Sequence, residues 1–267
     1  AERFALNNRR ILIRSINMTS PSFSIYNYTG TRKRPAVVME EEPEIVNDPD
    51  NLRWNPEKWQ IVINRLAIHD GAFKSDKETE RDPYPFFDGN HIFFSGIDGR
   101  FNNVKLEQDS ITADVSLKTK ERSGFVVKNL SAKMRMHPEA MEFANLDLQT
   151  NRSRLTDFFA MRYRSFDDMG DFVTKVRMQA NFKKADLSSD DIAFFAPDVK
   201  AWKKKIQITG LVEGSVENPD GKDLIVLGGK DTYLSGNISV AGLPDINKTY
   251  IDFVTNGFRT TYNDAVS

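Results

Sequence analysis

The chain has 267 residues, of which 39% are hydrophobic and 28% charged, and its formal net charge is −1. A pI of about 6.4 leaves no global basic field for nucleic acid, and a mean hydropathy of −0.50 is that of a polar but globular chain. The absence of cysteine excludes disulfides, thiolate metal sites and cysteine nucleophiles, and no stretch approaches the roughly 20 apolar residues of a membrane helix.

Residues 31–58 differ in composition from the rest of the chain. They contain a basic cluster, "TRKR", an acidic cluster, "MEEEPE", and several prolines. Such a segment is typical of a long surface connection rather than of a packed element. We therefore interpret 31–58 as a charged, Pro-rich loop inserted into a single segment that covers residues 1–267.

Apolar side chains alternate with polar ones along most of the remaining sequence, beginning at Trp59. Trp59, Ile61 and Ile63 share one parity, and Leu66 and Ile68 share the other, which predicts a bulge or a kink between the two groups. The alternation returns with two further runs of apolar residues, Ile111-Ala113-Val115-Leu117 and Leu130-Ala132-Met134-Met136.

The second half of the chain continues the same pattern. Apolar or small residues occupy the even positions from Phe172 to Phe182 and from Ile206 to Val216. Two short helical segments are expected between strands, one turn from Ser165 and one or two turns within 188–202, where Asp190 and Asp191 suit a helix N-terminus. Ile238 and Val240, and then Ile251 and Phe253, flank a Gly-Leu-Pro corner at Gly242.

This pattern predicts a mainly β protein with long antiparallel strands, each half-buried, and few short helices. A sheet with one apolar face must cover that face with a second sheet, by curling, or with an apolar ligand. We expect the face to contain the residues Ile111, Val115, Leu117, Met134, Met136, Val176, Met178, Ile206, Ile208, Val212, Val216, Ile238 and Val240.

No catalytic or metal-binding pattern stands out among the polar residues. The three histidines, His69, His91 and His137, lack partners at metal-ligand spacing, and the glycine-containing turns lack the spacing of a phosphate loop. The acidic clusters do not follow a calcium-loop pattern. We expect no catalytic residue, no cofactor and no enzyme activity.

Several ordered phrases resemble a known family. They are "WQIVINRLAIHDGAFKSD" from Trp59, "FFDGNHIFFSGIDGRFNNVKLEQDSITADVSLKTKERSGFVVKNLSAKM" from Phe86, "DDIAFFAPDVKAW" from Asp190 and "SGNISVAGLPDINKTYIDF" from Ser235. Together they resemble the TamB-like proteins of the AsmA superfamily, in the form found in Bacteroidota. The resemblance covers nearly the whole chain except the 31–58 insertion.

The resemblance implies a sheet curled into an open groove, the β-taco, with an apolar lumen. It implies a protein of the Gram-negative periplasm that is anchored in the inner membrane and serves outer-membrane biogenesis. Phospholipid or another acyl-chain lipid would be its ligand, and an Omp85-type barrel of the outer membrane its partner. The anchor and the barrel-contacting domain are not found in this sequence, so we expect an inner section of the groove.

Three hypotheses follow for the apolar face. It conducts or shields acyl chains between the two membranes, it serves as a scaffold or chaperone for outer-membrane proteins through exposed strand edges, or it is the sealed core of a β-sandwich that binds another partner. The three differ in whether the apolar face is an open groove or a closed core.

Overall fold

All strands of the described chain form one 14-stranded sheet, and their order follows the sequence except that β3 lies off the path beside β4. The computed structural model describes residues 3–5, 8–28, 52–79, 81–201, 203–243, 245 and 248–266. The strands are β1 (Arg3–Ala5), β2 (Arg10–Thr19), β3 (Ser22–Asn27), β4 (Gln60–Lys77), β5 (His91–Glu107), β6 (Ser110–Glu121), β7 (Val126–His137), β8 (Ala140–Gln149), β9 (Arg154–Arg162), β10 (Arg177–Ser188), β11 (Lys205–Gly214), β12 (Pro219–Gly228), β13 (Thr232–Ala241) and β14 (Tyr250–Arg259).

Antiparallel pairing holds from β4 to β14, as the alternation predicted, but not at the N-terminal end. Here β2 and β3 both run parallel to β4, with Arg10 opposite Gln60 and Ser22 opposite Ala72. The 18-residue β4 is long enough to pair with the two shorter strands one after the other. The long connection that includes the 31–58 segment supplies the crossover that a parallel pair needs. Residues 31–51 of that segment lie outside the described residues.

Bulges interrupt the strands and are marked by residues with positive φ. The parity switch predicted near Leu66 is present, because Ile61 and Ile68 connect through β5 to Ile111 and Leu117, which lie on one face of β6. β4 and β5 change parity there together and keep their register, and a register shift between them follows between Ile68 and Gly71. Asp70, in that shift, has φ 52°. The same combination of a positive φ and a register shift occurs at Gly96, Asn103, Asn145, Gly210, Asp223 and Gly236. Bulges increase strand bending and twist, so a bulge in nearly every strand curves the whole sheet.

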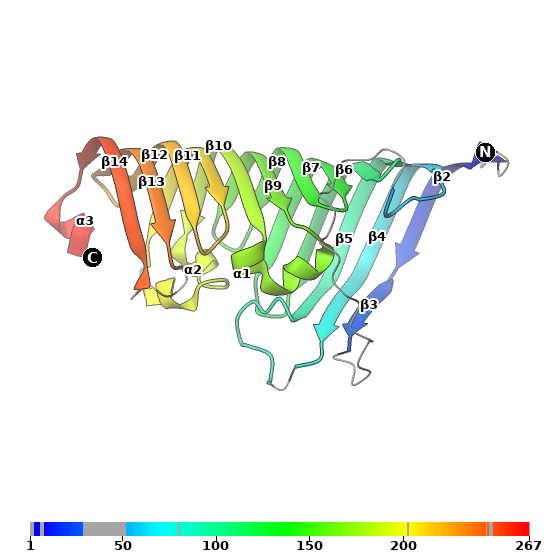
Figure 1. Cartoon of the computed structure of the whole chain (residues 1–267), viewed down its shortest axis with the longest axis horizontal. Coiled ribbons are helices and arrows are strands. Elements are labelled where there is room, and N and C mark those ends of the chain that lie inside the picture. The colour runs from blue at the N-terminus through cyan, green and yellow to red at the C-terminus, as the bar shows by residue number, and fades with distance from the viewer. Residues whose placement is uncertain are drawn as a thin grey trace, which may run out of the picture.

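The strands arch over along the upper side of the molecule in Figure 1, and the helical segments lie along its lower side. We call the two ends of the strand ladder margin A, with the turns at 108–109, 138–139 and 215–218, and margin B, with the turns at 122–125, 150–153 and 229–231. Both margins are lined by loops rather than by a second layer of secondary structure.

The helices are short, as expected, and lie between strands. Margin A carries η2 (Phe166–Asp171) and α1 (Phe172–Lys175), and margin B carries α2 (Ser189–Ile192) and η3 (Pro197–Ala201), while α3 (Tyr262–Val266) follows β14. The alternation counted from Phe172 therefore starts too early, because residues 172–175 are helical and β10 begins only at Arg177. No helix in the described ranges is long and apolar enough to cross a membrane.

Burial shows that the sheet does not enclose a sealed core. In the described part of the chain, the largest side chains that are fully buried are Glu121 and Val176, and no leucine, isoleucine, methionine or phenylalanine is among them. A sandwich of two facing sheets would bury many such side chains. The described strands instead form one sheet that is not closed into a barrel, which excludes the sealed-sandwich hypothesis.

Candidate functional site: the apolar inner face of the groove

One row of apolar or small residues crosses the sheet from β2 to β14 without interruption. Residues that are paired in register on neighbouring strands share a face of the sheet. Through successive pairs, every strand from β2 to β14 except β3 contributes one residue to this face. We call the series the long row: Met18, Ile68, Gly99, Leu117, Leu130, Leu148, Leu155, Ala185, Ile208, Val226, Leu234 and Phe258.

A second row on the same face lies near margin A and is rich in methionine. It runs through Ile11, Ile61, Leu106, Ile111, Met136, Met141, Met161 and Met178 and ends at Gly214 and Pro219. Four neighbouring strands thus place four methionines side by side. Because the thioether side chain is unbranched and flexible, such a surface adapts to apolar partners of varied shape.

A third row lies between these two and is mixed in size. It consists of Ala113, Met134, Phe143, Phe159, Ala180, Val212, Gly221, Ile238 and Phe253. Small residues such as Ala113, Ala180 and Gly221 alternate with large ones and let the sheet curl tightly. Around β10, a small cluster of Ala180, Phe182 and Ala185 packs against partly buried side chains of β9 and β11.

Eleven of the thirteen residues predicted for the apolar face lie in strands on it. Val115 is nearly buried and most of the others are half-buried, so they contribute exposed apolar area to the groove. The residues are Ile111, Val115, Leu117, Met134, Met136, Met178, Ile206, Ile208, Val212, Ile238 and Val240.

The other two predicted residues, Val176 and Val216, do not line the groove. Val176 lies between α1 and β10 and is completely buried, so no ligand reaches it. Val216 lies in the turn after β11, which ends at Gly214. The sequence predicts it to be in the strand because the alternation continues past the last paired residue. Periodicity alone does not show where a ladder stops.

The prediction also missed residues of β8 and β9 that lie on the face. Met141 and Phe143 of β8 pair with Met161 and Phe159 of β9. Their alternation is visible in "AMEFA" and "DFFAM", but Asn145, with positive φ, shifts its phase within β8. A bulge-tolerant count of alternation is the signal that would have found them.

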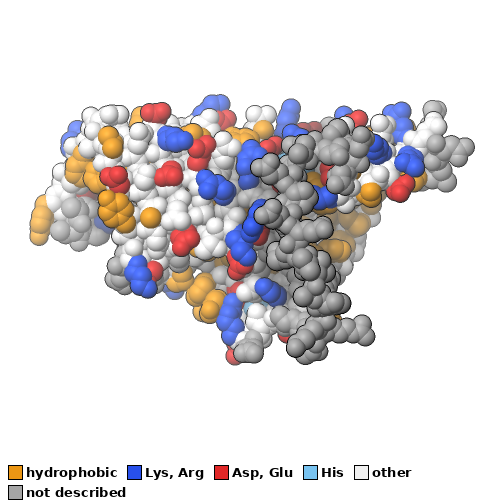
Figure 2. Space-filling view, in the orientation of Figure 1, with side chains coloured by type: hydrophobic (Ala, Val, Ile, Leu, Met, Phe, Trp, Pro, Cys, Tyr) orange, Lys and Arg blue, Asp and Glu red, His pale blue; other side chains and the backbone are white. Residues whose placement is uncertain are grey.

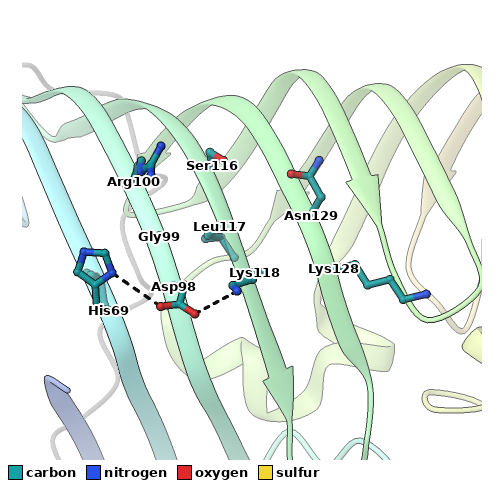
Figure 3. A pocket seen from close by; sticks show the side chains of 10 residues that line it. His69, Asp98, Gly99, Arg100, Ser116, Leu117, Lys118, Lys128 and Asn129 are labelled. Atoms are coloured by element: carbon teal, nitrogen blue, oxygen red, sulfur yellow. Dashed lines mark ion pairs between the residues drawn. The ribbon is translucent and has the colours of Figure 1, made fainter. Parts of the chain in front are cut away.

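Polar and charged side chains cover the opposite, outer face. Figure 2 shows a mixture of basic and acidic side chains over the body of the molecule, with hydrophobic ones gathered near the β14 end and along the lower side. A depression of about 370 Å³ is lined by polar residues such as Asp98 and Lys118 together with Gly99 and Leu117 of the long row (Figure 3). There Asp98 lies 3.4 Å from Lys118 Nζ and 3.9 Å from His69 Nδ1. Exposed ion pairs of this kind contribute little to stability.

The inner face is the concave one, because loops from the two margins meet across it. The β4–β5 loop, residues 78–90, belongs to margin B, and the β9–β10 connection, residues 163–176, belongs to margin A. The rings of Phe87 and Phe172, one from each, lie 6.3 Å apart. A Cβ placed on Gly89 would lie 2.7 Å from the Met169 carbonyl oxygen, so the two backbones are in direct contact.

Further aromatic rings extend this contact along margin B. Phe87 lies 5.1 Å from Phe195, which lies 5.2 Å from Phe125, and Phe125 lies 5.6 Å from Phe194. The Phe87 N–H also donates to the Phe194 carbonyl over 2.9 Å. Edge-to-face and tilted pairs of this kind stabilise contacts beyond their buried area.

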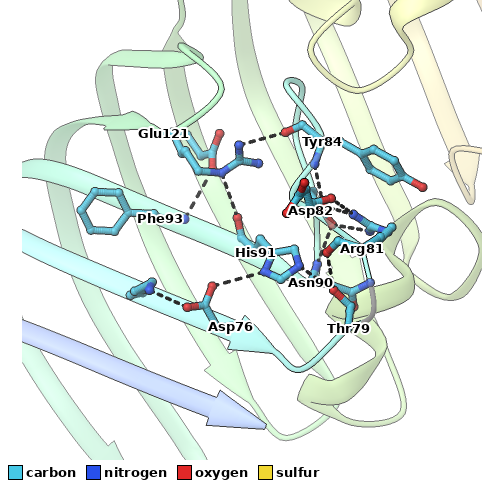
Figure 4. A network of polar contacts seen from close by, with 12 residues as sticks. Asp76, Thr79, Arg81, Asp82, Tyr84, Asn90, His91, Phe93 and Glu121 are labelled. Carbon is cyan, nitrogen blue, oxygen red and sulfur yellow. Dashed lines mark hydrogen bonds and ion pairs between the residues drawn. The ribbon is translucent and has the colours of Figure 1, made fainter. Parts of the chain in front are cut away.

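A buried aspartate, Asp88, holds the β4–β5 loop in shape. Figure 4 shows the polar contacts around its partners Arg81, Tyr84 and Asn90. Asp88 accepts two hydrogen bonds from the Arg81 guanidinium, of 2.7 and 3.0 Å, and two more from the backbone N–H groups of Tyr84 and Asn90. Burial alone would raise the pKa of Asp88, but these four bonds outweigh it and lower the pKa to about 2. The Arg81 guanidinium also lies 3.7 Å from the Tyr84 ring centroid.

Arg122, in the neighbouring turn of margin B, binds the same loop through its carbonyl groups. Its guanidinium donates to the backbone oxygens of Tyr84, Phe86 and His91 over 2.9 to 3.3 Å. Beside it, the fully buried Glu121 accepts hydrogen bonds from the N–H groups of Phe93 and Ser123. The loop that carries Phe87 is therefore a built structure rather than a loose connection.

In the described chain, no group of three or more histidine or acidic residues could hold a metal ion. Comparison with family models, with curated proteins and with solved structures finds no match. The resemblance to TamB-like proteins therefore stays a prediction from the sequence. The geometry of the inner face remains the feature from which a function can be argued.

Proposed function

We propose that the groove binds lipid acyl chains and conducts or shields them between the inner and outer membranes in outer-membrane biogenesis. The single observation that carries this proposal is the long row, an unbroken apolar track along a concave face that no second layer covers. A monomeric protein rarely exposes so extended an apolar surface without a ligand for it.

The mechanism is partition rather than catalysis. Each methylene group that moves from water to the apolar face contributes roughly 0.8 kcal/mol. Since the row members are similar in chemistry from strand to strand, a bound chain meets no polar barrier within the rows and can shift along them. A headgroup at the mouth would stay in water. The periplasmic location, the inner-membrane anchor and the Omp85-type partner of this proposal are supported by the sequence resemblance alone.

Site-specific photo-crosslinking tests the proposal with matched neighbours. A photoreactive residue at Met178 or at Val212 faces the groove, whereas the same residue at Gln179 or at Glu213 faces outward in the same strands. We expect labelled phosphatidylethanolamine in vesicles to be captured at 178 and 212 and not at 179 and 213. Equal capture at all four positions, or none at the inward pair, would contradict the proposal.

The free edge of β14 favours a second candidate function, a scaffold for β-rich outer-membrane proteins. In the described sheet β14 pairs only with β13, and large side chains on it are exposed, including Ile251 at 57% and Val254 at 67%. A client strand could extend the sheet there by β-augmentation. Photo-crosslinking at Val254 would then capture protein, and capture of lipid alone would argue against this function.

A further inference from the structure

The groove mouth is bridged at one place by the contact of Phe87 and Phe172. These residues come from opposite margins and from connections that lie on either side of several strands. The contact therefore spans the opening of the groove instead of joining neighbours in the ladder. Elsewhere in the described chain, no hydrogen bond or ring contact joins the loops of one margin to those of the other across the mouth.

The two sides of the bridge differ in how firmly they are held. The Phe87 side is fixed by the Asp88 and Arg122 networks. The Phe172 side sits on a helix of only four residues that contains no buried residue, and it is tied down by the buried Val176 that follows and by one hydrogen bond from the Glu217 N–H to the Val173 carbonyl. Where the sides meet, the side-chain oxygen of Asn90 is buried without a hydrogen-bond partner, and a Cβ on Gly170 would lie 3.3 Å from it.

The Phe87 side is therefore held to its own margin by more side-chain hydrogen bonds than the Phe172 side, so we take the Phe172 side as the one that moves. A buried unpaired acceptor costs free energy that is recovered when water reaches it. Hydration of the Asn90 oxygen on opening therefore offsets part of the free energy lost with the contact of Phe87 and Phe172. The ring pair, the close approach of residues 89–90 to residues 169–170 and the charge attraction between Lys77 and Asp171 hold the two sides together. Breaking so few contacts is compatible with transient opening.

We propose that Phe87 and Phe172 form a clasp that controls lipid passage through the middle of the groove. The inference rests on the proposed function. An amphiphile whose headgroup stays outside the mouth cannot pass a closed clasp, because its chain lies inside the groove and its headgroup outside. Phospholipid beneath the clasp exchanges only when the rings separate. A free fatty acid, with its small carboxylate head, is hindered less.

Lipid exchange with a locked clasp tests this proposal. The protein contains no cysteine, so Asn90→Cys combined with Gly170→Cys introduces the only thiol pair. We would load the protein with headgroup-labelled phosphatidylethanolamine and follow its release into unlabelled phosphatidylcholine vesicles. The same variant after reduction, and each single cysteine variant, are the controls. We expect a slow phase of release in the oxidised protein that is about tenfold slower than in the reduced protein.

Two alanine substitutions where the margins meet form a matched pair, of which only Gly89→Ala should open the clasp. Gly89→Ala places a Cβ against the Met169 backbone oxygen, whereas Gly170→Ala meets only the end of the Asn90 side chain. We expect Gly89→Ala and Phe172→Ala to speed the slow phase by roughly tenfold, the scale set by the loss of an aromatic contact. Gly170→Ala, and Phe23→Ala at an exposed ring of β3, should change it little.

The outcomes separate the clasp from the proposed function. Failure of the double cysteine variant to cross-link, both directly and through a short bismaleimide, would show that the margins do not meet and would overturn the clasp. Identical release from oxidised and reduced protein would overturn the clasp while leaving lipid binding intact. No lipid bound to any variant, with the cross-link formed, would overturn the proposed function and with it the control of passage.

Discussion

Phe182 in β10 and Phe258 in β14 have the same side chain and lie on the same inner face, but they differ in exposure. Phe182 is 7% exposed and Phe258 is 56% exposed. β10 has β9 and β11 on either side, whereas β14 has β13 alone among the described strands. The difference shows that lateral neighbours bury side chains in this fold, since no second layer is present.

The centre of the sheet and its C-terminal end also differ in how far loops cover the margins. At the centre, the β4–β5 loop and the β9–β10 connection meet across the mouth. At the C-terminal end, the short helix α3 lies against the β12–β13 turn, where Asp264 accepts hydrogen bonds from the N–H groups of Lys230 and Asp231, and also contacts Lys204. The centre therefore behaves as a packed unit, and the end remains available for contact.

The largest expected effect contrasts the two phenylalanines directly. Phe182→Ala removes a buried ring from the cluster with Ala180 and Ala185, and we expect it to lower the free energy of unfolding by about 3–4 kcal/mol. Phe258→Ala should cost less than about 1 kcal/mol, because its ring is already largely in water. Urea unfolding followed by circular dichroism measures both.

Similar losses for the two variants would break the comparison. They would mean that β14 is covered in solution, and repeating the measurement at a tenfold lower protein concentration would then show whether a second copy covers it. A concentration-dependent loss for Phe258→Ala points to association through this edge.

A second contrast concerns two aspartates that each organise a loop. Asp88→Ala at the centre leaves Arg81 and two backbone N–H groups without a buried acceptor, and we expect a loss of roughly 3 kcal/mol. Asp264→Ala at the end removes an acceptor on a partly exposed surface, where water can replace it, so the loss should be clearly smaller. Thermal unfolding of both variants checks the order, and the reverse order would contradict the central role of the Asp88 network.

The same aspartate makes the centre sensitive to acid. Because the folded-state pKa of Asp88 is lowered from 3.8 to about 2, its contribution is fully present above pH 4 and is lost as the pH falls through about 2. The shift corresponds to about 2 kcal/mol. We expect the stability of Asp88→Asn to fall less steeply than that of the wild type between pH 4 and pH 2, in unfolding curves recorded at half-unit steps. Parallel pH profiles for the two proteins would show that Asp88 does not titrate in this way.

The sequence was sufficient to predict the strands, their one-sided character and most residues of the inner face. The inner-face position of Ile206 and Ile208, or of Met134 and Met136, can be predicted from local sequence, because every half-buried strand alternates with the same period of two. The prediction fails where the alternation in the sequence continues beyond the ends of the strand. Val216 continues the pattern in a turn, and Val176 continues it backward toward a helical segment.

The clasp lay beyond any sequence pattern. Phe87 and Phe172 are far apart in the chain, and only the curvature of the sheet brings margin A to margin B. That curvature is the accumulated result of bulges at single residues such as Asp70 and Asn145, which look like ordinary polar positions in the sequence. The parallel placement of β2 beside β4 was equally hidden, since alternation does not encode direction.

The smallest expected effect tests whether the bulges bend the strands equally at the centre of the sheet and near its C-terminal end. Asp223 of β12 has φ 50° and Asn145 of β8 has φ 53°, and both tolerate this conformation better than a β-branched residue does. We expect Asp223→Val and Asn145→Val each to cost about 1–2 kcal/mol, with the glycine variants near neutral. Denaturant unfolding of the four variants decides the question. Equal penalties would mean that strand bending is set residue by residue, even where neighbouring strands no longer supply burial. A much smaller penalty at Asp223 would mean that the C-terminal end relaxes its bulge, so that the curl of the groove weakens toward β14.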